Sequence, residues 1–143
     1  MKKPAVRGNQ VRDWMTPHPV TVSSSCSLPG AYRLMLGCRI RRLLVVDQGV
    51  LVGVVTLEDL RRRMPDAVLS MDPLRENFPV DKILVRDVMT RDPYTIPPDA
   101  TLLQAARVML EFEISTLPVV DAGRLVGIIT ESDIFKAMVK RIM

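Results

Sequence analysis

The stretch "GVVTLED" (Gly53–Asp59) returns 74 residues later as "GIITESD" (Gly127–Asp133). In both copies an apolar run ends in a threonine, and an aspartate follows three residues later. The similarity extends outward from this phrase, because residues 11–64 and 85–138 align without a gap and share 24 identities in 54 pairs. The chain is therefore a tandem duplication.

The same order of elements is predicted in both copies. A short extended piece, "PVTV" or "PYTI", precedes a helix, and two apolar strands joined by "DQG" or "DAG" follow. A second helix begins at Leu57 or Glu131. Apolar strands without polar alternation are typical of strands buried on both faces. We predict an α+β fold of two β-α-β-β-α repeats packed sheet against sheet, since one repeat alone would be marginal.

The first helix of each copy is predicted from its cap. Thr101 precedes a helical apolar stripe in copy two. In copy one Ser27 is the expected cap, Pro29 is tolerated in the first turn, and Gly30 weakens the helix. The predicted stripe of copy two comprises Leu102, Ala105, Ala106, Met109 and Leu110.

The predicted organisation has four parts: a tail (1–10), repeat one (11–64), a linker (65–84) and repeat two (85–143). The linker contains prolines, but it is too apolar for a free tether. We therefore predict a short linker helix packed on the repeats, with the apolar residues Val68, Leu69, Met71, Leu74 and Phe78.

The composition is that of a globular protein, with 48% hydrophobic and 25% charged residues. No apolar run approaches the ~20 residues of a membrane span, and no signal-peptide core follows the first lysines. We expect a cytoplasmic protein without a membrane partner. Cys26 and Cys38 lie outside any C-x-x-C, and with one histidine they predict idle thiols and no zinc site.

No pattern in the sequence supports catalysis. The phosphate-binding, dinucleotide and serine-nucleophile motifs are absent. The single histidine, His18, lies in a turn where copy two has Asp92, and no partner for acid–base chemistry can be named. We expect a surface histidine, no enzymatic activity and no required cofactor.

The order of the phrases resembles the tandem CBS domain pair, a family named after cystathionine beta-synthase. The matching phrases are "VRDxMT" followed by Pro and Thr, "LLVVD" or "LPVVD", and "GVVTLEDL" or "GIITESDI", spanning Val11 to about Met138. The resemblance implies two repeats with pseudo-twofold symmetry in one Bateman-type module, and commonly a homodimer. It also implies clefts that bind AMP, ADP, ATP or S-adenosylmethionine, with magnesium only beside ATP. Such modules regulate a partner protein, which the sequence does not name.

The phrase Thr-x-x-Asp allows two interpretations. As a structural feature, the threonine caps the following helix and the aspartate bonds back to the cap. As a functional feature, the carboxylate accepts hydrogen bonds from two neighbouring hydroxyl groups of a ribose. The residues alone leave both interpretations open.

By resemblance, each ligand site draws on both copies, with Ile40 or Ile114 flanking the adenine. Site one is expected to contain Thr56, Asp59, Thr90, Thr95, Ile114 and Ser115. Site two is expected to contain Thr130, Asp133, Thr16, Thr21, Ile40, Arg41 and Arg42.

The net charge of +4 is unevenly spread, since residues 11–64 carry +4 and residues 85–138 carry −3. Arg41 and Arg42 stand where copy two has Ser115 and Thr116. A charge pair near ~4 Å contributes on the order of 4 kcal/mol at an effective dielectric near 20. We therefore expect phosphorylated ligands to prefer site two. The alternative is that the arginines form a solvated face.

Two other functions fit the sequence. An assembly module without a ligand would use a dimer face on the second helices. Nucleic-acid binding is compatible with a pI of 9.4, but an aromatic content of 4% provides no stacking platform, so we do not expect it. The candidate dimer faces are Leu57, Leu60 and Met64 in repeat one and Ile134, Ala137 and Met138 in repeat two.

Overall fold

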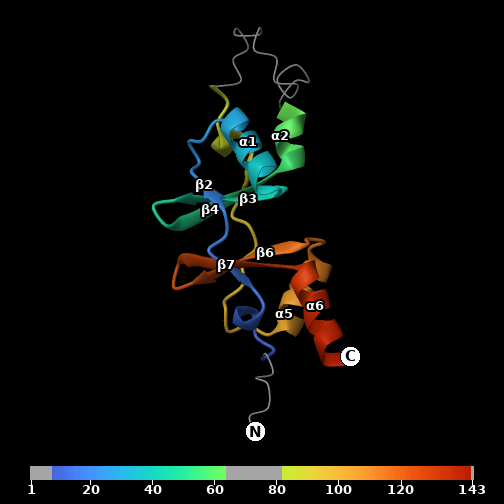
Figure 1. Ribbon diagram of the computed structural model, residues 1–143. Coiled ribbons are helices and arrows are strands. Elements are labelled where there is room, and N and C mark those ends of the chain that lie inside the picture. Colours follow the sequence, from blue (N-terminus) through green and yellow to red (C-terminus); the bar gives the residue numbers. More distant parts are fainter. Residues whose placement is uncertain (1–7, 64–81, 143) are drawn as a thin grey trace. The chain divides into compact units, whose positions relative to one another are not determined.

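The computed structural model describes residues 8–63 and 82–142 and divides the chain into two compact units (Figure 1). Unit 1 comprises Met1–Pro19 and Tyr94–Met143, and unit 2 comprises Val20–Pro93. The predicted linker helix around residues 68–78 falls outside the described residues. Within the described part of the chain, no helix has the length and apolar character needed to cross a membrane.

Unit 2 contains a four-stranded sheet in the order β2-β3-β4-β5. Helices α1 and α2 lie side by side on one face of this sheet (Figure 1). Helix α1 begins as predicted, because Ser27 Oγ accepts a hydrogen bond from the Gly30 N–H at 3.2 Å. The elements are β2 (Thr21–Val22), α1 (Leu28–Cys38), β3 (Arg42–Asp47), β4 (Val50–Thr56), α2 (Leu57–Arg63), α4 (Val85–Val88) and β5 (Thr90–Arg91).

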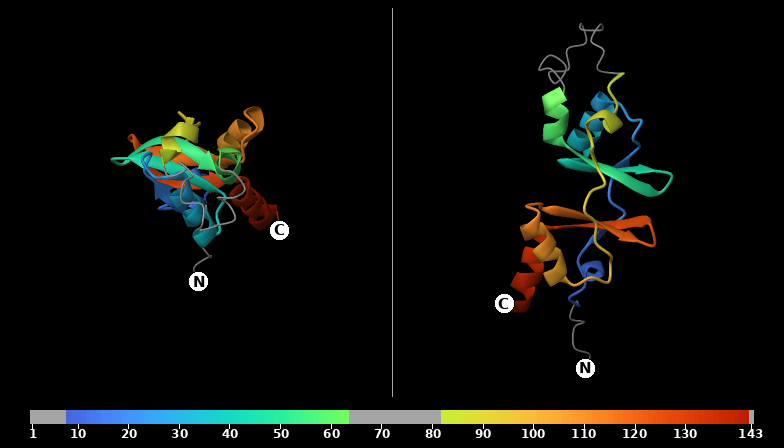
Figure 2. Two further views of the ribbon diagram at one scale, coloured as in Figure 1. Left: turned by 90° about the horizontal axis from the view of Figure 1, so that it is seen from above. Right: turned by 180° about the vertical axis from the view of Figure 1, so that it is seen from behind.

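Unit 1 contains a three-stranded sheet in the order β1-β7-β6. Helices α5 and α6 lie side by side against it, as Figure 2 shows from behind. Thr101 and Gln104 form the reciprocal cap of α5, with bonds of 2.8 and 3.1 Å. The elements are η1 (Val11–Asp13), β1 (Thr16–Pro17), α5 (Leu102–Glu111), β6 (Thr116–Asp121), β7 (Arg124–Thr130) and α6 (Glu131–Ile142).

The predicted strands and helices are confirmed in outline, with three corrections. Leu43, Leu44 and Val45 of β3 are all buried, whereas β4 alternates and buries fully only Gly53 and Val55. Leu110 was expected in the apolar stripe of α5 but is 80% exposed, because it lies about two turns after the exposed Leu103, on the same outward face of the helix. The piece "PYTI" forms only one bridge, Ile96 to Val119, since Pro97 and Pro98 follow and donate no backbone hydrogen bonds.

The first residues of each repeat, which we call its head (residues 11–17 and 85–91), belong to the unit that contains most of the other repeat. Val11 and Trp14, from repeat one, lie in the core of unit 1, where the Val11 N–H donates to Ala100 O at 2.8 Å. Val85, from repeat two, lies in the core of unit 2, where its N–H donates to Cys26 O at 2.8 Å. Each head also adds a two-residue strand, because β1 pairs with β7 and β5 pairs with β4.

A glycine in each repeat permits this exchange. A Cβ atom at Gly53 would lie 2.6 Å from Met89 Sδ and 2.8 Å from Thr90 O. A Cβ atom at Gly127 would lie 2.6 Å from Met15 Sδ and 2.9 Å from Thr16 O. The glycine in the repeated "VGVV" and "VGII" is therefore required by the close approach of the neighbouring strand.

Candidate functional site

The first Thr-x-x-Asp phrase caps its own helix. The Thr56 N–H donates to Asp59 Oδ2 at 2.9 Å, and the Asp59 N–H donates to Thr56 Oγ1 at 3.1 Å. This reciprocal arrangement is the predicted capping box. It uses one carboxylate oxygen, and among the described residues Oδ1 of Asp59 accepts no hydrogen bond. Capping therefore leaves acceptor capacity for a ligand.

The second phrase uses its aspartate in a related way. The Thr130 N–H donates to Asp133 Oδ2 at 2.9 Å, and the Thr130 hydroxyl donates to the same oxygen at 3.2 Å. The threonine hydroxyl is thus a donor here, whereas in repeat one it is the acceptor of a helix N–H. The structural interpretation is confirmed in full in repeat one. In repeat two the aspartate bonds back to the cap N–H as predicted, but the threonine hydroxyl accepts no helix N–H among the described residues. Neither arrangement excludes the functional interpretation.

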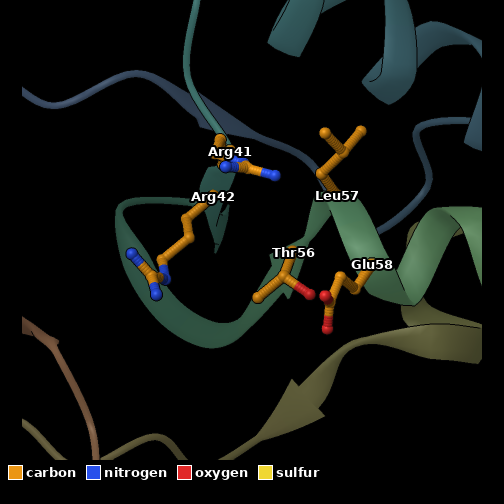
Figure 3. A pocket seen from close by; sticks show the side chains of 5 residues that line it. All are labelled: Arg41, Arg42, Thr56, Leu57 and Glu58. Carbon is orange, nitrogen blue, oxygen red and sulfur yellow. The ribbon is translucent and has the colours of Figure 1, made fainter.

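A pocket of about 430 Å³ opens beside the first phrase (Figure 3). Arg41 and Arg42 contribute one side of it, and Thr56, Leu57 and Glu58 contribute the other. The hairpin fixes this arrangement, because Arg42 pairs with Thr56 and the Leu57 N–H donates to Arg41 O at 2.8 Å. Its volume lies within the range of about 300–1,000 Å³ that small-molecule sites occupy.

The charge of the pocket favours an anion. Arg41 and Arg42 are exposed, and their planar guanidinium groups suit the bidentate binding of phosphate. Glu58 carries the opposing charge, but its carboxylate lies 3.8 Å from Arg62, and both side chains are 75% exposed. An exposed pair of this kind is worth little in stability. It does, however, offset part of the negative charge of Glu58 near the pocket.

Repeat two has the same backbone arrangement without the arginines. The Glu131 N–H donates to Ser115 O at 3.0 Å, and Thr116 pairs with Thr130 in the hairpin. The Thr116 hydroxyl is buried and, within the described residues, has no hydrogen-bond partner. This end of repeat two is therefore uncharged at the positions where repeat one has two guanidinium groups.

Each unit brings together part of each predicted site. In unit 2, β5 places Thr90 opposite Val54, next to the strand that ends at Thr56. In unit 1, β1 places Thr16 opposite Ile128, next to the strand that ends at Thr130. The pairing of each site across the two repeats stays a prediction. The site-one residues in unit 1 are Thr95, Ile114 and Ser115, and the site-two residues in unit 2 are Thr21, Ile40, Arg41 and Arg42.

The sequence interpretation missed that Arg41 and Arg42 line one pocket with Thr56. A signal for it was present, because the residues at the start of the first strand of a hairpin lie beside the end of the second strand. Leu57 and Glu58 were also not predicted to line a site.

The remaining candidate groups are not among the residues that line this pocket. His18 is exposed in a turn with a φ of 52°, and its counterpart Asp92 has a φ of 51°, so the predicted surface position of the histidine is confirmed. Burial raises the pKa of the Cys26 thiol, which makes it a weak nucleophile. Cys38 is exposed.

Comparison with known proteins identifies both repeats. The family model described as "CBS domain" matches residues 11–66 and 85–140. The structure of CBSX2 in complex with AMP has a TM-score of 0.78 and 32% identity, covering 95% of this chain and 100% of that one; CBSX2 is from Arabidopsis thaliana. The CBS domain pair of protein MJ0100, in complex with 5-methylthioadenosine and S-adenosyl-L-methionine, has a TM-score of 0.73 and 29% identity. The match covers 92% of this chain and 97% of that one.

Some curated relatives are much longer proteins. An inosine-5'-monophosphate dehydrogenase of Korarchaeum cryptofilum is 36% identical over 117 residues, which are 81% of this chain and 21% of that protein. The chain spans 33% and 60% of the next two curated relatives. The similarity therefore covers only part of these relatives.

Proposed function

Because the chain belongs to the CBS-domain family and carries two copies of the domain, we propose that it is a regulatory module that binds an adenosine-containing ligand. Binding would alter how the module acts on a partner protein, and the module itself would catalyse no reaction. The similar structures are complexes with AMP, 5-methylthioadenosine and S-adenosyl-L-methionine. These compounds, together with ADP and ATP, are therefore the candidate ligands.

The pocket at Thr56 is the observation that carries this proposal. It combines a threonine hydroxyl and two guanidinium groups in a volume of about 430 Å³. The adjacent Asp59 keeps one carboxylate oxygen available in the described structure, which suits a diol. We propose that Arg41 and Arg42 hold the phosphate of AMP, ADP or ATP. Magnesium would accompany ATP only.

The structure suggests a revision of the expected site preference. The resemblance assigns Arg41 and Arg42 to site two with Asp133, but within unit 2 these arginines share a pocket with Thr56. We propose that the phosphate binds beside the arginines, and that Asp59 is the aspartate that holds the ribose of the same ligand. The counterpart in repeat two has Ser115 and Thr116 in place of the arginines and Glu131 in place of Leu57, so it would suit a ligand without phosphate, such as 5-methylthioadenosine.

Titration of the full chain by calorimetry and thermal shift tests the proposal. A ligand at 100 times its Kd should stabilise the fold by about 2.7 kcal/mol. Arg41→Ala should weaken AMP binding by about tenfold or more, because a hydrogen bond to a charged group contributes about 1.5–3 kcal/mol. 5-Methylthioadenosine, which lacks phosphate, should be little affected. Arg61→Ala is the matched control, since Arg61 is an exposed arginine outside the pocket.

The aspartates decide between the two assignments. If the proposal is right, Asp59→Ala and Arg41→Ala each weaken the same AMP site, and Asp133→Ala spares it. If Asp133→Ala and Arg41→Ala act on one site instead, the assignment to site two holds. If no adenosine compound shifts the melting temperature, the sensor function is wrong and the assembly module is favoured.

A further inference from the structure

Two aromatic side chains of unit 1 are stacked at its surface. The ring centroids of Tyr94 and Phe112 lie 3.9 Å apart, and the ring planes are inclined by 18°. The two residues are 51% and 40% exposed, and neither belongs to the core cluster of unit 1. Exposed aromatic residues are typical of binding surfaces, where tyrosine and phenylalanine are enriched. The stack therefore needs an explanation other than the packing of the core.

The end of helix α5 holds Phe112 in a defined position. The Phe112 N–H donates to Val108 O at 3.1 Å, and the Ile114 N–H donates to Met109 O at 3.0 Å. Between these two residues, Glu113 has a φ of 54°. Glycine is the usual residue in this left-handed conformation after a helix. The helix end thus presents an aromatic ring and a carboxylate from consecutive residues.

The charge beside the stack is negative. Glu111 and Glu113 flank Phe112 in the sequence, and both are exposed. In the described structure neither carboxylate has an ion-pair or hydrogen-bond partner, and Arg107, one turn before Glu111, forms no ion pair with it. Both carboxylates are therefore available to a ligand. We call the surface formed by Tyr94, Glu111, Phe112 and Glu113 the aromatic–acidic face.

Repeat one has a different character at the equivalent positions. The residues that replace the aromatic–acidic face there are Val20, Gly37, Cys38 and Arg39. The backbone is nevertheless the same, because Arg39 has a φ of 56° and the Ile40 N–H donates to Met35 O at 3.0 Å. The duplicated fold therefore requires neither the rings nor the carboxylates. This difference indicates a role that is specific to repeat two.

A guanidinium group is the ligand that this chemistry favours. The face of an aromatic ring carries negative charge density, and it attracts a cation that lies within about 6 Å of the ring centroid. An arginine side chain is planar, stacks on such a ring and binds a carboxylate through two parallel hydrogen bonds, which a lysine ammonium group cannot do. A phosphate or carboxylate ligand would be repelled by both glutamates.

We propose that the aromatic–acidic face binds an arginine side chain in a basic segment of a partner protein. The guanidinium group lies on the outer face of one stacked ring, and Glu113 accepts its hydrogen bonds. Because the rings are already stacked before the partner binds, little side-chain freedom is lost on binding. This inference goes beyond the proposed function, since it gives the chemistry of a protein partner and requires no adenosine ligand.

The test titrates the full chain with the peptide acetyl-Gly-Arg-Gly-Arg-Gly-amide at a physiological ionic strength of ~0.15 M, followed by NMR. The largest shifts should occur at Tyr94 and residues 111–114. The same peptide with citrulline in place of arginine lacks the charge and should not bind. Tyr94→Val, which copies repeat one, should weaken binding roughly two- to fivefold, as expected for a cation on an exposed ring. Glu113→Arg, also copied from repeat one, should weaken it by about tenfold or more.

Two controls separate this site from other effects. Asp121→Arg reverses an exposed charge at the other end of β6 and should leave peptide binding unchanged. Tyr94→Val should still bind AMP, which distinguishes a failure of this inference from a failure of the proposed function. The amide spectra of the variants verify that each is folded.

Four results would overturn the proposal. They are no binding of the arginine peptide, equal binding of the citrulline peptide, shifts centred outside the aromatic–acidic face, and equal effects of Glu113→Arg and Asp121→Arg. A change in the mass of the chain caused by Glu113→Arg, measured by ultracentrifugation, would also overturn it, because the face would then bind a second copy.

Discussion

At the scale of single residues, Asp47 is a carboxylate whose surroundings differ between the two repeats. It accepts hydrogen bonds from the Ser24 hydroxyl at 2.6 Å, the Ser24 N–H at 3.0 Å and the Ser23 hydroxyl at 3.3 Å. These bonds, the one from the Ser24 hydroxyl foremost, lower the pKa of Asp47 below its usual value of 3.8. Repeat two has Pro97 and Pro98 in place of the serines.

The pKa shift predicts a dependence of stability on pH. A carboxylate with a lowered pKa in the folded state stabilises the fold above its unfolded pKa, and this contribution disappears as the pH falls through the folded pKa. We expect Asp47→Asn to lower the melting temperature near pH 7 and to have a smaller effect near pH 3. Thermal melts at both pH values would measure this. Asp121→Asn, at the equivalent position of repeat two, is the control, and an equal effect of both variants would contradict the explanation.

The residues that could be predicted from the sequence were those whose partners are local. The capping roles of Ser27, Thr101 and Thr56 follow from spacings of three residues, and each is present. The position of Arg41 beside Leu57 depends on a hairpin register. That register includes an irregularity at Val45 and Val46, which no local pattern specifies.

At the scale of elements, the hairpin turns are well defined. Ala122 and Gly123 form a two-residue loop between the paired residues Asp121 and Arg124, with φ angles of 50° and 80°. Positive φ at both central residues is the requirement of a type I′ turn, for which Asn-Gly is preferred. Alanine in this conformation costs roughly 1 kcal/mol.

Ala122→Asn should therefore stabilise the protein by up to about 1 kcal/mol, which corresponds to roughly 2–4 °C in melting temperature for a chain of this size. Gln48→Asn tests the same idea in the other hairpin, where φ is 51°. Gly123→Ala should destabilise, because it places a Cβ atom at a φ of 80°. Destabilisation by both asparagine variants would show that the turns are not of this type.

The long elements were predictable and the shortest were not. Strands β3, β4, β6 and β7 carry continuous apolar runs, and the helices carry caps and periodicity. Strands β1 and β5 contain two residues each and have no pattern that distinguishes them from a turn. They exist because glycines in β7 and β4 admit them, which is a tertiary cause.

At the scale of the whole molecule, the repeats in the sequence and the compact units in the structure have different boundaries, because the heads of the repeats are exchanged. The duplication repeats at Val11 and Val85, whereas unit 2 extends from Val20 to Pro93. Sequence identity locates the repeat, but it cannot show which core each head enters, since both heads read "VRD" followed by an apolar residue and "MT". Contacts within the cores decide this.

Two fragments of equal length test the exchange. Residues 20–93 contain the whole of unit 2, including Val85 in its core and β5 against β4. Residues 11–84 contain the complete first repeat but lack Val85 and β5, and they retain Trp14 without the core of unit 1. We expect fragment 20–93 to show the more cooperative thermal unfolding and the better dispersed amide spectrum. Loss of a fully buried valine and a paired strand removes several kcal/mol, a large part of the stability of a domain this small. If fragment 11–84 proves the more stable, the head of each repeat folds with its own repeat and the exchange is wrong.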